Sequence, residues 1–397
     1  MSPYIPPAPR YSAMTTHTAQ EISDNPIEIA PNTWWVGRRE PGAIFYANPY
    51  LRAFPGKNGG RDFHLLIDPG SNKDFAVVRA KSERVIGDIR KVEGVFINHQ
   101  DPDVGSAIGL MLGRFVPDCH VLCSEDTWRL VQYYNVPREK FVAVEKFPNG
   151  FRLPNDERIL PVASPFCHFV GAWMLYDPQN RVLFTGDLFG SLTDKAAEGI
   201  YADESDWVGM RAFHQIYMPT NKALTIAIQR IRALVPAVEV IAPQHGRLIR
   251  GPWVQEFINR LERLPVGLDI LDDRNQTTQE LHAWNQVLMR ILSTARQSMG
   301  PTIEKTLLAE PELAGLLADD NGRLKITTMG RSTIEVLLRV LGEKASPHQM
   351  DAVRYEAITA SLELDLPTPT IELDEADMAD PHAARSNPSP RAFASAE

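Results

Sequence analysis

Four short apolar segments, far apart in the chain, each run into histidine or aspartate. Residues 95–98 are followed by His99, Asp101 and Asp103 at every second position. Alternate residues of an extended chain point to the same side. Three further apolar segments border His168, Gly186-Asp187 and His245. Because ligands collect at strand ends in open α/β sheets, these residues are expected to converge on one site.

Each of these residues also has an ordinary structural explanation. An aspartate such as Asp103 after a strand can cap a helix by accepting its first amide protons. Asp187 after Gly186 suits a turn, and a single loop histidine is more often hydrogen-bonded than metal-bound. Six residues of ligand type, each next to a strand, are hard to obtain from independent caps and turns. The sequence therefore favours a metal site.

The pattern of apolar residues predicts two domains. Residues 28–251 alternate β-rich runs with amphipathic helical stretches, which is typical of a layered α/β domain. Strands are expected at 33–36, 64–67, 94–98, 120–123, 173–176, 181–184 and 238–242. In residues 252–366 the strand signal largely disappears, and apolar residues repeat every three or four positions from Leu281 to Met299. This repeat predicts a mostly helical module whose apolar stripe is ordinary core.

The two ends of the chain differ in composition from the two predicted domains. Residues 1–27 combine early prolines with a Ser/Thr-rich stretch and predict a disordered lead. Residues 367–397 carry five acidic residues between positions 372 and 380, followed by a Pro/Ser/Ala-rich run. Repulsion between these carboxylates predicts a solvated, disordered acidic tail. An acidic docking tail is the functional alternative.

Composition argues against several classes of protein. A formal net charge of −9 is unsuited to a sequence-independent nucleic-acid binder, which needs a basic surface. No stretch approaches the roughly 18 uninterrupted apolar residues of a membrane span. Three cysteines do not make a disulfide framework, and no apolar signal region follows the start. We expect a cytoplasmic protein that binds neither nucleic acid nor membranes.

Taken in order, these motifs resemble the ligand series of the metallo-β-lactamase fold superfamily. The resemblance covers roughly residues 28–250 and implies an αββα sandwich. Hydrolases of this superfamily have His-x-His-x-Asp-His in the first motif. This chain has Asp101 in place of the second histidine and Val104 in place of the last one.

An acidic residue at the position of Asp101 resembles the flavodiiron proteins, which have His-x-Glu-x-Asp there and hold two irons. The similarity extends to segments 48–51, 66–70 and 214–218. Added carboxylates give a harder site than His and Cys do, and such a site suits iron or manganese better than zinc. We therefore expect two iron ions, with manganese or zinc less favoured.

The resemblance also implies how the ligands divide. The metal ligands carried over by position are His99, Asp101 and His168 for one metal, Asp103 and His245 for the other, and Asp187 shared between them. Val104 supplies no donor, so the second metal is expected to keep an open position for O₂ or NO. Trp207, Phe213 and Tyr217 fall in the segment that covers the metals in that family. Simple aromatic packing explains these three equally well.

Flavodiiron enzymes continue into a flavodoxin-like domain, and residues 252–397 lack its phosphate loop. The nearest resemblance is therefore to oxygen-binding diiron proteins without a flavodoxin domain. Either a separate electron donor supports reduction of O₂ or NO, or the bound gas acts as a signal. The apolar face between Leu281 and Met299 also suits a helix–helix interface, so a homodimer is expected. The alternative function is a dinuclear hydrolase of thioesters, lactones or phosphodiesters.

Overall fold

The structure is a computed structural model that describes residues 25–40, 42–57, 60–194, 196–271, 278–320, 323–327 and 329–370. The chain divides into two compact units, Met1–Asp273 and Arg274–Glu397. The disordered lead and the acidic tail expected from the sequence lie almost wholly outside the described residues. Among the described residues, no helix is long and apolar enough to cross a membrane.

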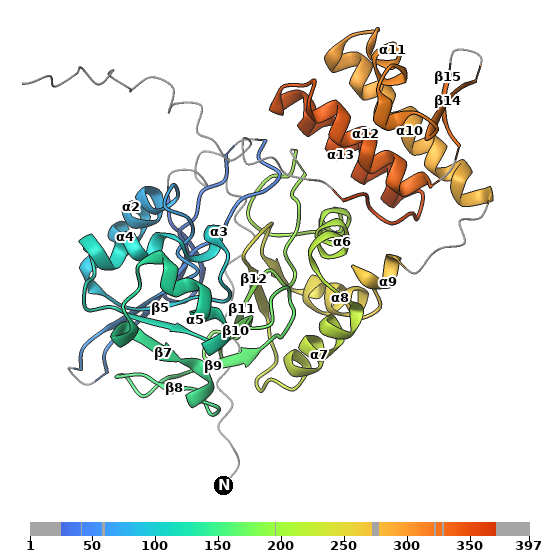
Figure 1. Cartoon of the computed structure of the whole chain (residues 1–397). Helices are drawn as coiled ribbons and strands as arrows, with labels where there is room; N and C mark the ends of the chain where they lie inside the picture. Colours follow the sequence, from blue (N-terminus) through green and yellow to red (C-terminus); the bar gives the residue numbers. More distant parts are fainter. Residues whose placement is uncertain are drawn as a thin grey trace, which may run out of the picture. The chain divides into compact units, whose positions relative to one another are not determined.

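The first unit contains two β-sheets (Figure 1). The first sheet has seven strands in chain order, and they are β1 (Ile27–Ala30), β2 (Thr33–Trp35), β3 (Tyr50–Phe54), β4 (Phe63–Ile67), β5 (Val92–Phe96), β6 (His120–Cys123) and β7 (Phe141–Ala143). Strands β1 to β4 pair antiparallel, and β4 to β7 pair parallel. Parallel neighbours need crossover connections, and helices fill most of these connections.

The second sheet has six strands in the order β13-β12-β11-β10-β9-β8. They are β8 (Phe151–Arg152), β9 (Arg158–Ala163), β10 (Trp173–Asp177), β11 (Val182–Gly186), β12 (Val240–Pro243) and β13 (Ile249–Arg250). Strands β11 and β12 are parallel. The residues that follow these two strands therefore lie at the same edge of the sheet.

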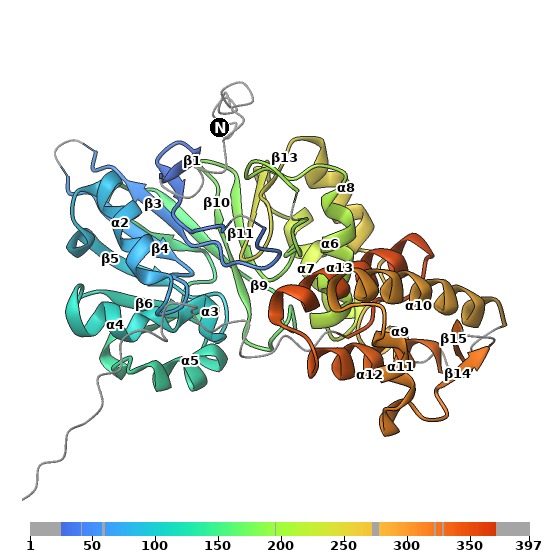
Figure 2. The same cartoon turned by 90° about the horizontal axis from the view of Figure 1, so that it is seen from above.

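Helices cover the outer faces of both sheets, as Figures 1 and 2 show. The first sheet is covered by α2 (Phe75–Ile86), α3 (Pro102–Gly105), α4 (Ala107–Arg114) and α5 (Glu125–Val131). The second is covered by α6 (Asp206–Tyr217), α7 (Asn221–Arg232) and α8 (Pro252–Leu261). One apolar cluster lies between the two sheets. A second cluster joins the first sheet to its helices, and a third joins the second sheet to its helices. The αββα sandwich expected from the resemblance is confirmed.

The first unit continues past residue 251, where the sequence suggested a boundary. Val254, Phe257, Ile258 and Leu261 of α8 are buried in the same cluster as residues of β10, β11 and β12. The short helix α9 (Leu268–Leu271) follows before the division at Asp273. Helix α8 therefore completes the outer layer of the sandwich and belongs with the sheets.

The second unit is mostly helical, as predicted. It consists of α10 (Thr278–Met299), α11 (Ile303–Leu308), β14 (Leu317–Asp320), β15 (Arg323–Ile326), α12 (Gly330–Gly342) and α13 (Pro347–Glu363). The antiparallel hairpin β14–β15 was not expected. The apolar stripe of α10 packs inside this unit, in one cluster with residues of α12 and α13. Most of that stripe is therefore core, and the homodimer stays a prediction.

Candidate metal centre

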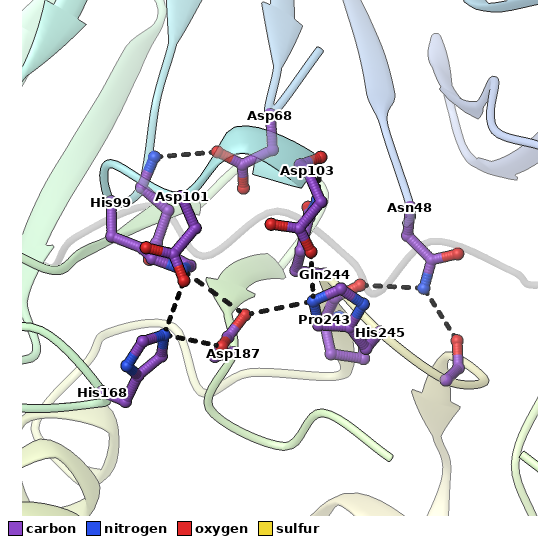
Figure 3. Close-up of polar contacts among 12 residues, drawn as sticks. Asn48, Asp68, His99, Asp101, Asp103, His168, Asp187, Pro243, Gln244 and His245 are labelled. Atoms are coloured by element: carbon purple, nitrogen blue, oxygen red, sulfur yellow. Dashed lines mark hydrogen bonds and ion pairs between the residues drawn. The ribbon is translucent and has the colours of Figure 1, made fainter. Parts of the chain in front are cut away.

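Strand ends from both sheets meet at one edge of the sandwich (Figure 3). His99 follows β5, Asp187 follows β11 and His245 follows β12. His168 lies in the turn before β10. The sequence separates these residues by up to 146 positions, and the two sheets bring them together.

His99, Asp101 and His168 form one group with Asp187. His168 Nε2 lies 3.0 Å from Asp101 Oδ2 and 3.3 Å from Asp187 Oδ2. His99 Nε2 lies 3.6 Å from Asp101 Oδ2 and 3.7 Å from Asp187 Oδ1. Donor atoms around one ion, with bonds of about 2.1 Å, are separated by roughly 3 to 3.5 Å. The spacing of this group therefore suits a single metal ion.

Asp187 also faces a second group. His245 Nε2 lies 3.2 Å from Asp103 Oδ2 and 3.5 Å from Asp187 Oδ1. The two carboxylate oxygens of Asp187 thus face different histidines, Oδ2 toward His168 and Oδ1 toward His99 and His245 (Figure 3). A carboxylate in this position can bridge two ions.

Two atoms at the centre of the cluster indicate that a cation fits there. His99 Nε2 and Asp187 Oδ1 are buried and have no hydrogen-bond partner among the described residues. His99 is 0% exposed and Asp187 is 3% exposed. A buried polar atom without a partner costs about 1–3 kcal/mol. A cation between these two atoms would satisfy both, and the surrounding imidazoles and carboxylates are suitable ligands.

The electrostatics of the cluster also favour positive charge. Burial lowers the pKa of His99, but Asp187, Asp101 and Asp103 outweigh burial and raise this pKa to about 9. Burial raises the pKa of Asp101, yet the hydrogen bond with His168 and the nearby His99 imidazole bring it well below its usual value. Asp101 therefore stays ionised and attracts positive charge, which metal ions can supply once the histidines lose their protons.

Asp101 and Asp103 do not serve as helix caps here. Asp101 occupies the N-cap position of α3, but its side chain makes no capping hydrogen bond. Pro102, the next residue, has no amide proton that needs a cap. The expected extended alternation holds for His99 and Asp101 only, because α3 begins at Pro102. Asp103 therefore lies in the first turn of a helix and faces His245 instead.

Hydrogen bonds from the surrounding residues orient the histidine rings. Asn98 Oδ1 lies 2.8 Å from His99 Nδ1, and the Tyr46 carbonyl lies 2.9 Å from His245 Nδ1. These contacts leave both Nε2 atoms directed into the cluster. Asp68 Oδ1 accepts the Asn98 amide proton over 2.8 Å. Contacts of this kind fix the tautomer of a ligating histidine and raise its basicity.

Aromatic rings cover one side of the cluster. Phe213 lies 5.5 Å from His245 between ring centroids, and Tyr217 lies 6.1 Å from His168. Trp207, the third pocket candidate, instead stacks on Phe257 at 6.1 Å. Trp207 lies on the first turn of α6 and packs toward α8, whereas Phe213 and Tyr217 lie in the C-terminal half of α6.

Sequence reasoning missed Phe45, which makes the nearest aromatic contact in the cluster. Its ring stacks on His245 with centroids 4.2 Å apart and planes 23° apart. Phe45 lies in the connection before β3, inside the apolar run 43–47, which does not distinguish it from its neighbours. Its only signal is that it lies three residues before Asn48, at the start of the segment that resembles the flavodiiron proteins.

A two-sheet sandwich with a carboxylate-rich histidine cluster at its strand ends defines a metallo-β-lactamase-like protein with a candidate dinuclear metal centre. The family description "ODP family beta lactamase" matches residues 45–246, which is half of the chain and contains all six candidate ligands. The chain belongs to this family.

Solved structures and a curated relative agree with this assignment. A structure titled "Peroxy diiron species of chemotaxis sensor ODP" is 27% identical, with a TM-score of 0.52, and the match covers 64% of this chain and 99% of that one. The rubredoxin oxygen:oxidoreductase of Desulfovibrio gigas shares the fold at 14% identity and a TM-score of 0.51, with 69% of each chain covered. A nitric oxide reductase of Moorella thermoacetica is 22% identical over 57% of this chain. The match spans only 58% of that relative's length.

Proposed function

We propose that this protein is a non-haem diiron protein that binds O₂ or NO. His99, Asp101 and His168 would hold one iron, Asp103 and His245 the other, and Asp187 would bridge them. The observation that carries the proposal is the buried pair of unpartnered atoms, His99 Nε2 and Asp187 Oδ1, at the centre of a carboxylate-rich cluster. Two ferrous ions would supply the electrons and the free coordination positions that a diatomic ligand needs.

The donor set distinguishes iron from zinc. Zinc sites favour histidine and cysteine, whereas carboxylates make a harder, more anionic site suited to iron or manganese. Here three aspartates accompany three histidines. Val104, where the hydrolases have a histidine, has no donor atom and is fully buried with the apolar residues of α4. These two differences support diiron chemistry over hydrolysis.

The surrounding residues give the site an apolar lining on one side. The rings of Phe45 and Phe213 limit the access of water on the side of His245, and the Tyr217 ring packs against Phe213. On the other side Asp101 is 31% exposed at its side chain and His168 is 23% exposed. A small gas molecule could thus reach the site. Anionic substrates would be repelled by the three aspartates.

Sensing is the form of this function that we favour over reduction. The match to the chemotaxis sensor covers almost the whole of that protein. The second unit, which consists of helices and one hairpin, offers surfaces for transmitting a signal. Reduction of O₂ or NO would require electrons from a separate donor. The cytoplasmic location remains a prediction.

Anaerobic purification followed by metal analysis tests the proposal. We expect about two irons per chain and a visible absorption band that changes when O₂ or NO is added separately. Asp187→Asn should lose much of the iron, because it removes the charge of the bridging carboxylate. Asp118→Asn is the matched control, since the Asp118 side chain is fully exposed. A colourless zinc protein with no response to either gas would refute the proposal.

A further inference from the structure

A groove in the second unit lies between α10 and β15, and its volume is about 350 Å³. This volume is within the usual range for ligand-binding pockets. Leu281 and Met289 of α10 line one side, and Leu324 of β15 lines the other. Met289 is 41% exposed. The groove therefore presents an apolar surface that no described residue covers fully.

The edge of β15 that faces α10 has an unused pair of backbone groups. The amide of Ile326 donates to Asn285 Oδ1 over 2.8 Å, and the Ile326 carbonyl accepts from Asn285 Nδ2 over 3.3 Å. Ile326 thus faces α10, whereas the amide of Thr327 donates to Leu316 on the β14 side. Because backbone groups alternate along a strand, those of Leu324 also face away from β14. Among the described residues these two groups of Leu324 have no hydrogen-bond partner, so they can pair with an added extended segment.

The charges around the groove are mostly positive. The cations Arg323 and Lys325 line it with the single carboxylate of Asp320, and the imidazole of His282 also borders it. Within the described part of the chain, Arg323 and Lys325 make no ion pair. Most other arginines of this unit do, for example Arg290 with Glu356. The groove therefore suits an extended acidic segment that also carries apolar side chains.

One segment of this chain has that composition. Residues 371–374 read Ile-Glu-Leu-Asp, so apolar and acidic residues alternate. Residues 371–380 contain five carboxylates and no cation. In an extended conformation, Ile371 and Leu373 would point to one side and the first carboxylates to the other. The apolar side can cover Leu281 and Met289 while the acidic side meets the cations.

The chain leaves the described part of the second unit close to this groove. The amide of Thr370 donates to Glu335 Oε1 over 2.8 Å, and Glu335 lies on the second turn of α12. Gly330, at the start of α12, lies against Trp284, because a Cβ placed there would be 2.3 Å from Trp284 Cδ1. Trp284 precedes Asn285, which borders the groove.

We propose that residues 371–380 dock into the groove between α10 and β15, with their carboxylates on Arg323, Lys325 and His282. The docked segment pairs with the backbone groups of Leu324 and covers the apolar surface of the groove. This proposal is independent of the metal centre.

Hydrogen exchange on the full-length protein tests the docking. Neutralising the five carboxylates together (E372Q, D374N, E375Q, D377N and D380N) should make the 323–327 amides exchange about fivefold faster or more. Arg323→Glu combined with Lys325→Glu should have the same effect. Lys305→Glu is the matched control, because Lys305 is exposed on α11, outside the groove. The wild-type protection should weaken at high salt, since exposed charges are screened.

A charge exchange makes the test specific. Adding Glu372→Lys and Asp374→Lys to the Arg323→Glu, Lys325→Glu protein should restore slow exchange, which a general destabilisation of the hairpin would not allow. Exchange at 323–327 that is unchanged in the neutralised protein would overturn the proposal. Protection that rises with protein concentration would also overturn it, and would indicate docking from a second copy.

Discussion

Gly186 controls the geometry of the metal centre because it is followed directly by Asp187. Its φ of +60° is a conformation that residues with a side chain rarely adopt, and a Cβ there would lie 2.1 Å from the Asn98 carboxamide. Gly186→Ala should displace both Asp187 and the contact that orients His99. We expect metal affinity to fall about 10- to 100-fold, measured by chelator competition. Gly113→Ala is the control, because its added Cβ meets no atom within 4 Å; equal losses in both variants would contradict this explanation.

Asn48 holds the segment that carries His245. Its Nδ2 donates to the carbonyls of Pro243 and Gly246, over 3.0 and 2.7 Å, and its Oδ1 accepts from Trp35 Nε1 over 2.8 Å. Asn48→Ala leaves Trp35 Nε1 and the Gly246 carbonyl without these partners, so the free energy of unfolding of the first unit, measured in urea, should fall by about 1–3 kcal/mol. Metal affinity should fall in parallel. Exposed Asn149→Ala should change neither quantity, and a normal metal affinity in Asn48→Ala would show that this clamp does not position His245.

The residue types at the site could be predicted from the sequence, but their supporting contacts could not. His99, His168 and His245 stand out because each borders a strand and belongs to a ligand-type motif. Phe45 and Asn98 have no such marker, since their roles arise from packing between segments far apart in the chain. Trp207 illustrates the opposite case. The resemblance placed it in the segment that covers the metals, but Trp207 lies on the first turn of α6 and packs against Phe257.

At the scale of elements, α6 is tied to the loop after β11 by a buried histidine. His214 Nε2 accepts the Phe189 amide proton over 3.0 Å, and Nδ1 lies 2.7 Å from the Met210 carbonyl. The amide can donate only to a neutral imidazole. Burial lowers the pKa of His214 from 6.5 to about 4. The helix therefore depends on this side chain remaining uncharged.

This lowered pKa predicts a loss of stability in acid. The unfolded chain takes up the His214 proton below about pH 6.5, whereas the folded chain does not until about pH 4. The contribution of neutral His214 to the free energy of unfolding is thus complete above pH 6.5 and is lost as the pH falls toward 4. Between pH 7 and pH 5 the wild type should lose about 2 kcal/mol more unfolding free energy than His214→Gln, which keeps a donor and an acceptor. Parallel losses in the two proteins in urea titrations would exclude His214 as the cause.

The elements themselves were predictable to different degrees. The seven strands expected from β-rich runs all occur, with ends shifted by at most two residues, because buried strands carry a strong local signal. Strand β3 was not among the expected strands. It is buried at every position, so its sequence lacks the alternation of apolar and polar residues that marks a half-exposed strand. Helix α8 lies beyond the last expected strand, and only its burial against β10–β12 shows that it belongs to the sandwich.

At the scale of the whole molecule, the metal ligands and the second core belong to different units. All six candidate ligands precede Asp273, and every buried residue of the second apolar core lies between Trp284 and Leu366. A bound metal stabilises only the unit that holds it. At free metal 100-fold above its dissociation constant, this stabilisation is about 2.7 kcal/mol.

Metal removal should therefore act on one unfolding transition and not on the other. Treating the full-length protein with a strong chelator should lower the urea midpoint of the first unit, whereas the second unit should keep its midpoint. Hydrogen exchange distinguishes the two unfolding transitions when it is measured separately on peptides from 92–123 and from 330–363. These segments belong to the cores of different units. Asp187→Asn should make the first unit insensitive to the chelator. A shift of both midpoints by the same amount would mean that the two units unfold as one, and would contradict the independence inferred from their separate cores.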